Sequence, residues 1–243
     1  MHFHLPRPPH GWDAVAWEVG VVVLGVLIAL GAQQIMQDFS DRQRVERASV
    51  ALRQEFAGHD GNYISYEVAA PCVYAQIDAI ERKLASGDRT PLPLYRDPIY
   101  SDGFVIRFPT NSFSDSAWRA IESTELMRLL DPKLASVGSD YYGRFDNLRH
   151  FNLDAISQMS ALSALSVMMP SSEQDRLHFI ERLEQLREDM FRFELAARQM
   201  RAALASVGML PAKSAQPLTV QRTAGFCRAH GFPLGKVVPA EAD

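Results

Sequence analysis

The apolar and polar positions of this chain divide it into a uniformly apolar N-terminal helix and a longer amphipathic part. No side chain from Val19 to Gln37 is charged. As an α-helix these residues would span about 28 Å, close to the ~30 Å core of a bilayer. Apolar residues surround the whole helix, so no polar stripe is left to face water. The pattern therefore predicts a membrane anchor over residues 13–37, after an N-terminal tail of residues 1–12.

Two alternatives to a retained anchor remain open, a cleaved signal peptide and a buried core helix. The strictly apolar part ends before Gln33, which brings it near the length of either. Ala29-Leu30-Gly31 would pass as a cleavage site, but one Arg and two acidic residues are a poor match to a signal-peptide N-terminus. We favour the anchor, since Trp12 and Trp17 precede it where interfacial aromatics are expected. The residues expected to hold it in the bilayer are Trp17, Val19, Val23, Leu24, Gly25, Leu27, Ile28, Ala29 and Leu30.

Beyond the anchor, apolar residues recur at spacings of three and four and predict an all-α fold. The first amphipathic pattern continues the anchor as a stalk helix to about Ala57, before Gly58. Residues 60–86 predict a second helix, which Pro71 must kink or restart. The predicted helical domain covers residues 38–208.

Two further long helices complete this prediction. Asp131-Pro132 is typical of a helix start, with an acidic N-cap and Pro at the first position. Ser171, with Gln174 three positions on, predicts the N-terminus of the last helix after Pro170. Two long helices joined by so short a turn must be antiparallel, and with the two earlier helices they predict a bundle of about four. The last helix carries a heptad seam, formed by Leu186, Met190, Phe193, Ala197, Met200, Leu204 and Val207.

Residues 89–111 form a Pro-rich aromatic segment, predicted to be an ordered loop on the bundle. Ser114 is expected to cap a short helix that contains Trp118. Trp118 would cap the bundle core or, with Phe104 and Phe108, line a ligand pocket, and we favour core capping. Residues 209–243 contain four prolines and are predicted to be an extended tail.

Composition and charge exclude little beyond nucleic-acid binding. The net charge of −4 gives no basic footprint for a nucleic acid. Cys72 and Cys227 would form one disulfide in an oxidising compartment, or remain two small buried residues.

Catalytic and metal-binding motifs are missing from the sequence, so we expect no enzyme and no cofactor. Cys227-x-x-His230 offers two metal ligands where a zinc site needs four. His178-x-x-Glu181 reverses the order that a di-iron bundle uses. His150 and Asp154, one helical turn apart, are expected to be a local charge pair rather than a catalytic dyad.

The anchor also carries a resemblance to a known group of proteins. Its Glu18-Val19-x-x-Val22-Val23-Leu24-Gly25-Val26-Leu27-Ile28-Ala29-Leu30 resembles the N-terminal signature of a family of uncharacterised bacterial membrane proteins. Their short basic or Pro-containing tail is followed by a G-E-I-x-L-V-V-I-G-I-L-I-A-L-type helix and a helical domain. Trp17 stands where that family usually has Gly. The resemblance covers about the first forty residues and implies a location in the inner membrane, with no chemistry.

These features predict a single-pass protein of the bacterial inner membrane that acts as a non-catalytic scaffold or interaction module. Its expected partners are the lipid bilayer and a second copy or another membrane protein, since Gly25-x-x-x-Ala29 could support helix pairing. The alternatives are a ligand-sensing bundle that acts through a partner and an enzyme with an unrecognised site. Arg42, Arg44 and their neighbours after the helix favour a cytoplasmic domain, whereas the two cysteines favour the periplasm slightly.

Overall fold

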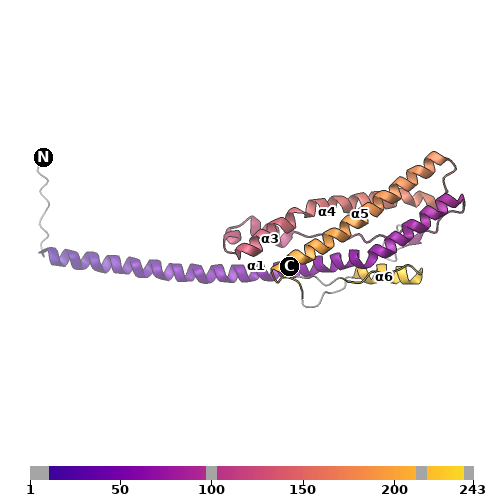
Figure 1. The fold of residues 1–243 in the computed structure, drawn as a ribbon. Helices are drawn as coiled ribbons and strands as arrows, with labels where there is room; N and C mark the ends of the chain where they lie inside the picture. The colour runs from indigo at the N-terminus through magenta and orange to yellow at the C-terminus, as the bar shows by residue number, and fades with distance from the viewer. Residues whose placement is uncertain (1–10, 97–102, 212–217, 238–243) are drawn as a thin grey trace, which may run out of the picture. The chain divides into compact units, whose positions relative to one another are not determined.

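The computed structural model describes residues 11–96, 103–211 and 218–237 (Figure 1). The first helix is α1 (Gly11–Ser86), followed by two short strands, β1 (Tyr95–Arg96) and β2 (Gly103–Phe104), which pair antiparallel. The remaining elements are α2 (Ser116–Glu122), η1 (Glu125–Arg128), α3 (Pro132–Gly143), α4 (Phe145–Leu162), η2 (Ser163–Ser166), α5 (Glu173–Ser206) and α6 (Leu218–Ala229). The all-α class predicted from the sequence is confirmed.

Helix α1 is longer than predicted, because it joins the two helices expected at 13–57 and 60–86. It passes through Gly58, Gly61 and Pro71 without a break, so the restart allowed for at Pro71 is wrong. The four-helix bundle is not confirmed, since two of its four expected helices are one.

A contact from the C-terminal end of the chain accompanies Pro71. Proline has no N–H, so the carbonyl of Glu67, four residues earlier, loses its helical donor. Gly235 lies at this point, where its N–H donates to the Val68 carbonyl at 3.0 Å. A Cβ on Gly235 would stand only 2.2 Å from the Glu67 oxygen, so the approach requires glycine. The backbone after α6 therefore packs directly against the imperfect turn of α1.

The chain divides into two compact units, Met1–Ala48 and Ser49–Asp243. The helical domain thus begins later than the predicted residue 38. Phe39, Leu52 and Phe56 share the three-and-four spacing of the predicted stalk helix, but Phe39 is 61 % exposed, whereas Leu52 and Phe56 are buried. Their spacing therefore does not predict which of them is buried, because burial depends on whether another helix packs against the residue.

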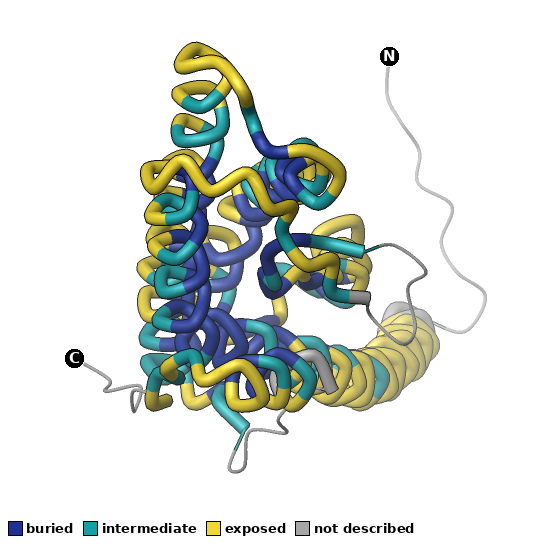
Figure 2. Tube along the Cα trace, turned by 90° about the vertical axis from the view of Figure 1, so that its right-hand side faces the viewer, coloured by how far each residue is buried: buried dark blue, intermediate teal, exposed yellow. Residues whose placement is uncertain are grey.

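Within the second unit, residues 49–86 of α1, the successive helices α3 and α4, and α5 lie side by side (Figure 1). Helix α5 returns antiparallel to α4, and the buried residues face the interior between the helices (Figure 2). The predicted seam of α5 is buried from Leu186 to Leu204, and Val207 is half-buried at the C-cap. Periodicity therefore identified the core face of α5 correctly.

One ion cluster lies within this core and joins α1 to α5. The Arg201 Nε donates to Asp60 Oδ1 at 2.8 Å, and its Nη1 donates to both Glu67 carboxylate oxygens at 3.1 and 3.2 Å. All three side chains are at least nine-tenths buried. A cluster of this kind fixes the register of two helices, because each charge is costly without its counterpart.

Helix termini differ from prediction by small amounts. Asp131 is the N-cap of α3 as predicted, accepting from the N–H groups of Lys133 and Leu134 at 3.0 Å. The helix expected from there to Met169 instead divides at Arg144 into α3 and α4.

The other two predicted caps are each displaced by one residue. Ser172, not Ser171, caps α5, and its Oγ accepts from the Asp175 N–H at 3.0 Å. Asp115, not Ser114, occupies the N-cap position of α2. Each start offers more than one capping side chain in a row, Ser114-Asp115-Ser116 before α2 and Ser171-Ser172 before α5, so local sequence alone does not select the register.

The segment 209–243 is not the extended tail that was predicted, because it contains α6. Thr223, Ala224 and Cys227 of this helix are buried, and Cys227 is bonded to Cys72 of α1. A short helix with prolines on either side is held by this tertiary bond rather than by its own periodicity.

Candidate functional site

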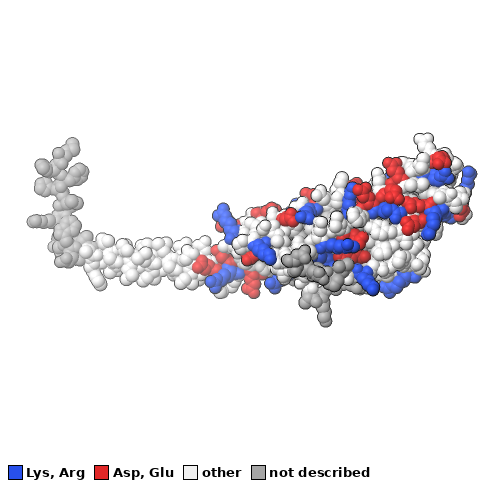
Figure 3. All heavy atoms as spheres, viewed as in Figure 1, with Lys and Arg blue, Asp and Glu red and all other residues white. Residues whose placement is uncertain are grey.

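The predicted anchor is exposed at every residue from 16 to 37. Among its residues, Trp17 is 75 %, Leu27 60 % and Ile28 64 % exposed. Its most apolar window has a mean hydropathy of 2.2, and none of it is buried. On the face drawn in Figure 3 no charged side chain is visible along the white part of this helix, in agreement with the uncharged sequence from Val19 to Gln37. A helix of a soluble core would be mostly buried, so the structure favours a membrane segment or a signal sequence over a core helix.

Trp118 and Phe108, two of the three residues considered for a pocket, are buried against different neighbours rather than lining a common space. Trp118 is buried and stacks on Tyr142, with ring centroids 5.1 Å apart. A Cβ on Gly138 would lie 2.4 Å from the Trp118 ring, so glycine makes this packing possible. Phe108 is buried against Phe193, and Phe104 is half-buried in β2. Trp118 therefore completes the core, which was the favoured interpretation.

A different hollow, missed from the sequence, lies between α1 and the segment 112–117. It has a volume of about 730 Å³ and is lined mainly by polar residues. Its walls include Glu55, Gly58 and His59 on one side, and Ser114 and Ser116 on the other. We call it the Glu55–His59 hollow. Its two sides are about 55 residues apart in the chain, so no local motif reveals it.

The carboxylate of Glu55 is held in place by four donors. Its Oε2 accepts from the Ser114 and Ser116 hydroxyls at 3.0 and 3.1 Å and from the Ala117 N–H at 3.0 Å. Its Oε1 accepts from the Tyr142 hydroxyl at 2.5 Å. Four donors match the acceptor capacity of a carboxylate, so Glu55 organises one wall of the hollow.

His59 is 2 % exposed and ends a short chain of hydrogen bonds. The Tyr63 hydroxyl donates to the Tyr141 hydroxyl at 3.1 Å, and the Tyr141 oxygen lies 3.1 Å from His59 Nδ1. With Tyr63 donating to its oxygen, the Tyr141 hydroxyl still needs an acceptor for its own proton, and His59 Nδ1 lies in reach. We therefore assign that proton to the bond with Nδ1 and the imidazole proton to Nε2. Within the described residues no group meets the strict hydrogen-bond geometry at Nε2, but an interaction of the imidazole with the Ser114 backbone raises the pKa of His59 and opposes the effect of burial.

We predict a specific pH dependence of stability from His59. Burial lowers the pKa of His59 from 6.5 to about 4, against the opposing carboxylates of Glu55 and Asp115. Between these pH values the unfolded chain binds a proton that the folded chain does not, so the free energy of unfolding falls as pH falls. The expected loss from pH 6.5 to pH 4 is about 3 kcal/mol, which His59→Gln should remove.

Asp189 provides a control for this measurement. Burial raises its pKa to about 6, so its contribution to the pH dependence of the free energy of unfolding has the opposite sign to that of His59. It gains a proton in the folded state first, so it adds stability as pH falls below 6. Chemical denaturation of the wild type, His59→Gln and Asp189→Asn at several pH values separates the two. Equal slopes for the wild type and His59→Gln would contradict the prediction.

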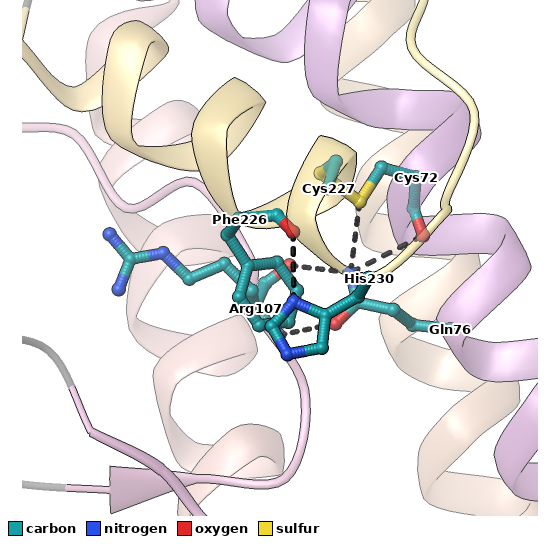
Figure 4. Close-up of a disulfide and its surroundings, with 6 residues drawn as sticks. All are labelled: Cys72, Gln76, Arg107, Phe226, Cys227 and His230. Atoms are coloured by element: carbon teal, nitrogen blue, oxygen red, sulfur yellow. Dashed lines mark hydrogen bonds between the residues drawn. A yellow bond between two sulfur atoms is a disulfide. The ribbon is translucent and has the colours of Figure 1, made fainter.

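The disulfide between Cys72 and Cys227 joins α1 to α6 (Figure 4). Both cysteines are fully buried. Gln76 lies beside them and ties the loop after β2 to α1, since its Nε2 donates to the Arg107 carbonyl at 3.1 Å and its Oε1 accepts from the Arg107 N–H at 2.7 Å. His230 is turned toward its own helix, with Nδ1 2.9 Å from the Phe226 carbonyl.

The motifs weighed as metal or catalytic sites have structural partners instead. Cys227 is in the disulfide, so it offers no thiolate beside His230. Arg182 donates to His178 Nε2 at 3.0 Å. His150 and Asp154 form an exposed pair at 3.5 Å, as expected. Over the described ranges, no group of three or more His, Cys, Asp or Glu residues could hold a metal ion.

Comparison with known proteins gives no further assignment. No protein-family model, curated protein or solved structure matches this chain.

Proposed function

We propose that this chain is a single-pass protein of the bacterial inner membrane, whose helical domain is a non-catalytic interaction module. The exposed apolar stretch of α1 carries this proposal. An apolar helix with none of its most apolar window buried is stable only where lipid or another apolar partner covers it. The resemblance of Glu18 to Leu30 to a bacterial membrane-protein signature supports the same location.

We further propose that the domain faces the periplasm. A buried disulfide between Cys72 and Cys227 is typical of an oxidising compartment and rare in the cytoplasm. Arg42, Arg44 and Arg47 after the anchor favour the opposite orientation under the positive-inside rule. We give the disulfide more weight, because it is integral to the domain fold whereas the arginine bias is only a statistical tendency.

Two surfaces support a role in protein interaction. Within the membrane, Gly25 and Ala29 lie one turn apart, and a Cβ on Gly25 would meet nothing within 4 Å. Such a small-residue surface permits the close approach of a second helix. On the domain, Leu153 of α4 and Phe191 of α5 are 64 % and 58 % exposed. The second candidate function, a ligand-sensing domain that acts through a partner, is favoured by the Glu55–His59 hollow.

The orientation is tested by labelling intact cells with a membrane-impermeant maleimide, followed by denaturation. We expect no labelling of Cys72 or Cys227 without reductant, and labelling of both when cells are treated with reductant and denaturant under conditions that leave the inner membrane sealed. Free thiols that react only after the inner membrane is opened would place the domain in the cytoplasm. If washing the membrane fraction with carbonate releases the protein, the assignment of a membrane anchor is wrong.

The interaction role is tested by crosslinking the tagged full-length protein in membranes and identifying what it binds. We expect a second copy or a specific membrane protein, and loss of that product when Gly25 and Ala29 are both replaced by leucine or when Phe191 is replaced by glutamate. A monomer with no crosslinked partner would overturn the scaffold interpretation. The result of the labelling experiment does not depend on a partner, so the proposed location and the proposed role are tested independently.

A further inference from the structure

We propose that the Glu55–His59 hollow binds a small uncharged molecule that carries several hydroxyl or amide groups. This goes beyond the interaction module proposed above and does not depend on its partner. The proposal rests on the shape of the hollow at Gly58, on the buried Nε2 of His59, and on the charges around both.

Gly58 leaves room in the wall of the hollow. It lies within α1, where glycine destabilises a helix relative to alanine. A Cβ at this position would meet nothing within 4 Å, so no packing within the domain requires glycine. A side chain there would instead extend into the hollow that Gly58 lines. The glycine therefore keeps open a space that the fold itself does not use.

His59 supplies a donor at the base of this space. Its Nδ1 faces Tyr141 in the core, so the protonated Nε2 lies on the side of the Ser114 backbone, which borders the hollow. A buried donor without a well-formed hydrogen bond is costly to the fold. A small outward shift of the segment at Ser114 would let a ligand oxygen accept from Nε2. With a pKa of about 4, His59 stays a neutral donor throughout the physiological range.

The charges around the hollow exclude ionic ligands. Glu55 repels an anion, and Asp115 lies close enough to act on the same imidazole. A cation is attracted by Glu55, but to coordinate it the cation would have to displace donors that the carboxylate already accepts from, and Asp115 is neutralised by Arg119 and Arg149 at 2.8 and 2.9 Å. An uncharged ligand avoids both costs.

The remaining lining matches such a ligand. Gln54 and the Ser112 hydroxyl offer both donors and acceptors, and Asn62 keeps an N–H beyond the one that donates to the Ser112 carbonyl. The Ser114 and Ser116 hydroxyls donate to Glu55, so they offer a ligand only acceptor lone pairs. A volume of about 730 Å³ falls within the range of small-molecule sites, and is ample for a sugar of one or two rings.

The test uses the full chain in lipid nanodiscs at pH 6.5, with sugars of similar size that differ in charge. The neutral probes are N-acetylglucosamine and trehalose, and the charged probes are glucosamine and glucuronate. Binding is followed by saturation-transfer NMR and by the shift in unfolding temperature. We expect saturable binding of at least one neutral probe, with a Kd of about 1 mM, and binding of the charged probes at least about tenfold weaker.

Two variants localise the binding. Gly58→Trp should fill the hollow and abolish binding, whereas Gly143→Trp should leave it unchanged. Gly143 is a matched control, because it is also helical and exposed, and a Cβ there also meets nothing within 4 Å. If Gly58→Trp reduces helical content by circular dichroism, Gly58→Leu replaces it. Absence of saturable binding by both neutral probes, equal binding by the charged ones, or binding that survives a folded Gly58 variant would each overturn the proposal.

Discussion

Replacing Arg201 by alanine is expected to destabilise the helical domain by about 3–5 kcal/mol. The guanidinium contacts Asp60 and Glu67, and all three side chains lie within the core between α1 and α5. Alanine removes the cation that faces both carboxylates and leaves their negative charge in a medium of low polarity. Denaturant unfolding of the full chain, followed by circular dichroism, measures the change.

Arg198→Ala provides the matched control for this variant. Arg198 lies on the same helix and pairs with Glu194, but its side chain is 54 % exposed. An exposed pair of this kind contributes about 0–1 kcal/mol. The triple variant Asp60→Asn, Glu67→Gln, Arg201→Met should regain most of the loss, because it removes the buried charges together. A loss for Arg201→Ala as small as that for Arg198→Ala would show that the cluster does not stabilise the fold.

Removing the disulfide is the second change with a large expected effect. Cys72 and Cys227 are separated by 155 positions, so the bond restricts a large part of the unfolded chain. The loop-entropy relation gives about 5 kcal/mol for a loop of this length, and losses of native disulfides are typically about 2–5 kcal/mol. We expect Cys72→Ser with Cys227→Ser to lower the free energy of unfolding by about 3–5 kcal/mol. Urea titrations of the variant and the wild type measure this difference.

Adding reductant separates the contribution of the covalent bond to stability from that of the packing of the two cysteine side chains. The wild type unfolded and refolded with excess reductant should match the variant, whereas reductant should leave the variant unchanged. Proteolysis gives a second readout, since loss of the bond should expose the chain around α6 to cleavage before the rest of the domain. Identical unfolding midpoints for the oxidised and reduced wild type would contradict the prediction.

The sequence predicted correctly the features that depend only on neighbouring residues, such as the buried face of α5 and the start of α3. The seam of α5 from Leu186 to Leu204 is buried because one apolar face per helix is a property of sequence spacing alone. Asp131-Pro132 starts α3 for a similar reason, since the N-cap acid and the proline act on neighbouring N–H groups.

The errors occur where a distant segment decides the local structure. Gly58 and Pro71 are normally helix breakers, yet α1 continues through both. At Pro71 the backbone of Gly235 packs against the turn with the missing donor, a contact across more than 160 residues of chain. Helix α6 was missed because its position depends on Cys72 in α1. The amphipathic spacing of the stalk continued through Phe39, although the domain core begins near Leu52.

The candidate site was the least predictable part, for the same physical reason. Glu55 and His59 form an ordinary helical i, i+4 pair in sequence, and the serines at 112–116 resemble any polar loop. Only the approach of that loop to α1 brings Glu55 together with Ser114, Ser116 and the Ala117 N–H. Trp118, the aromatic residue singled out from the sequence, lies immediately after this segment, but its ring is stacked on Tyr142 in the core.

The position of the two cysteines also orders events during synthesis. Cys72 leaves the ribosome 155 residues before Cys227. At about 5–20 residues per second, its thiol is exposed for roughly 8–30 s before its partner exists. If the domain is translocated during translation, as the proposed periplasmic location would require, an oxidising catalyst would meet a solitary cysteine throughout that interval and would hold it as a mixed disulfide. The final bond then marks the arrival of the C-terminal segment, so a nascent chain truncated before Cys227 would carry a free or enzyme-bound Cys72 that identifies it as incomplete.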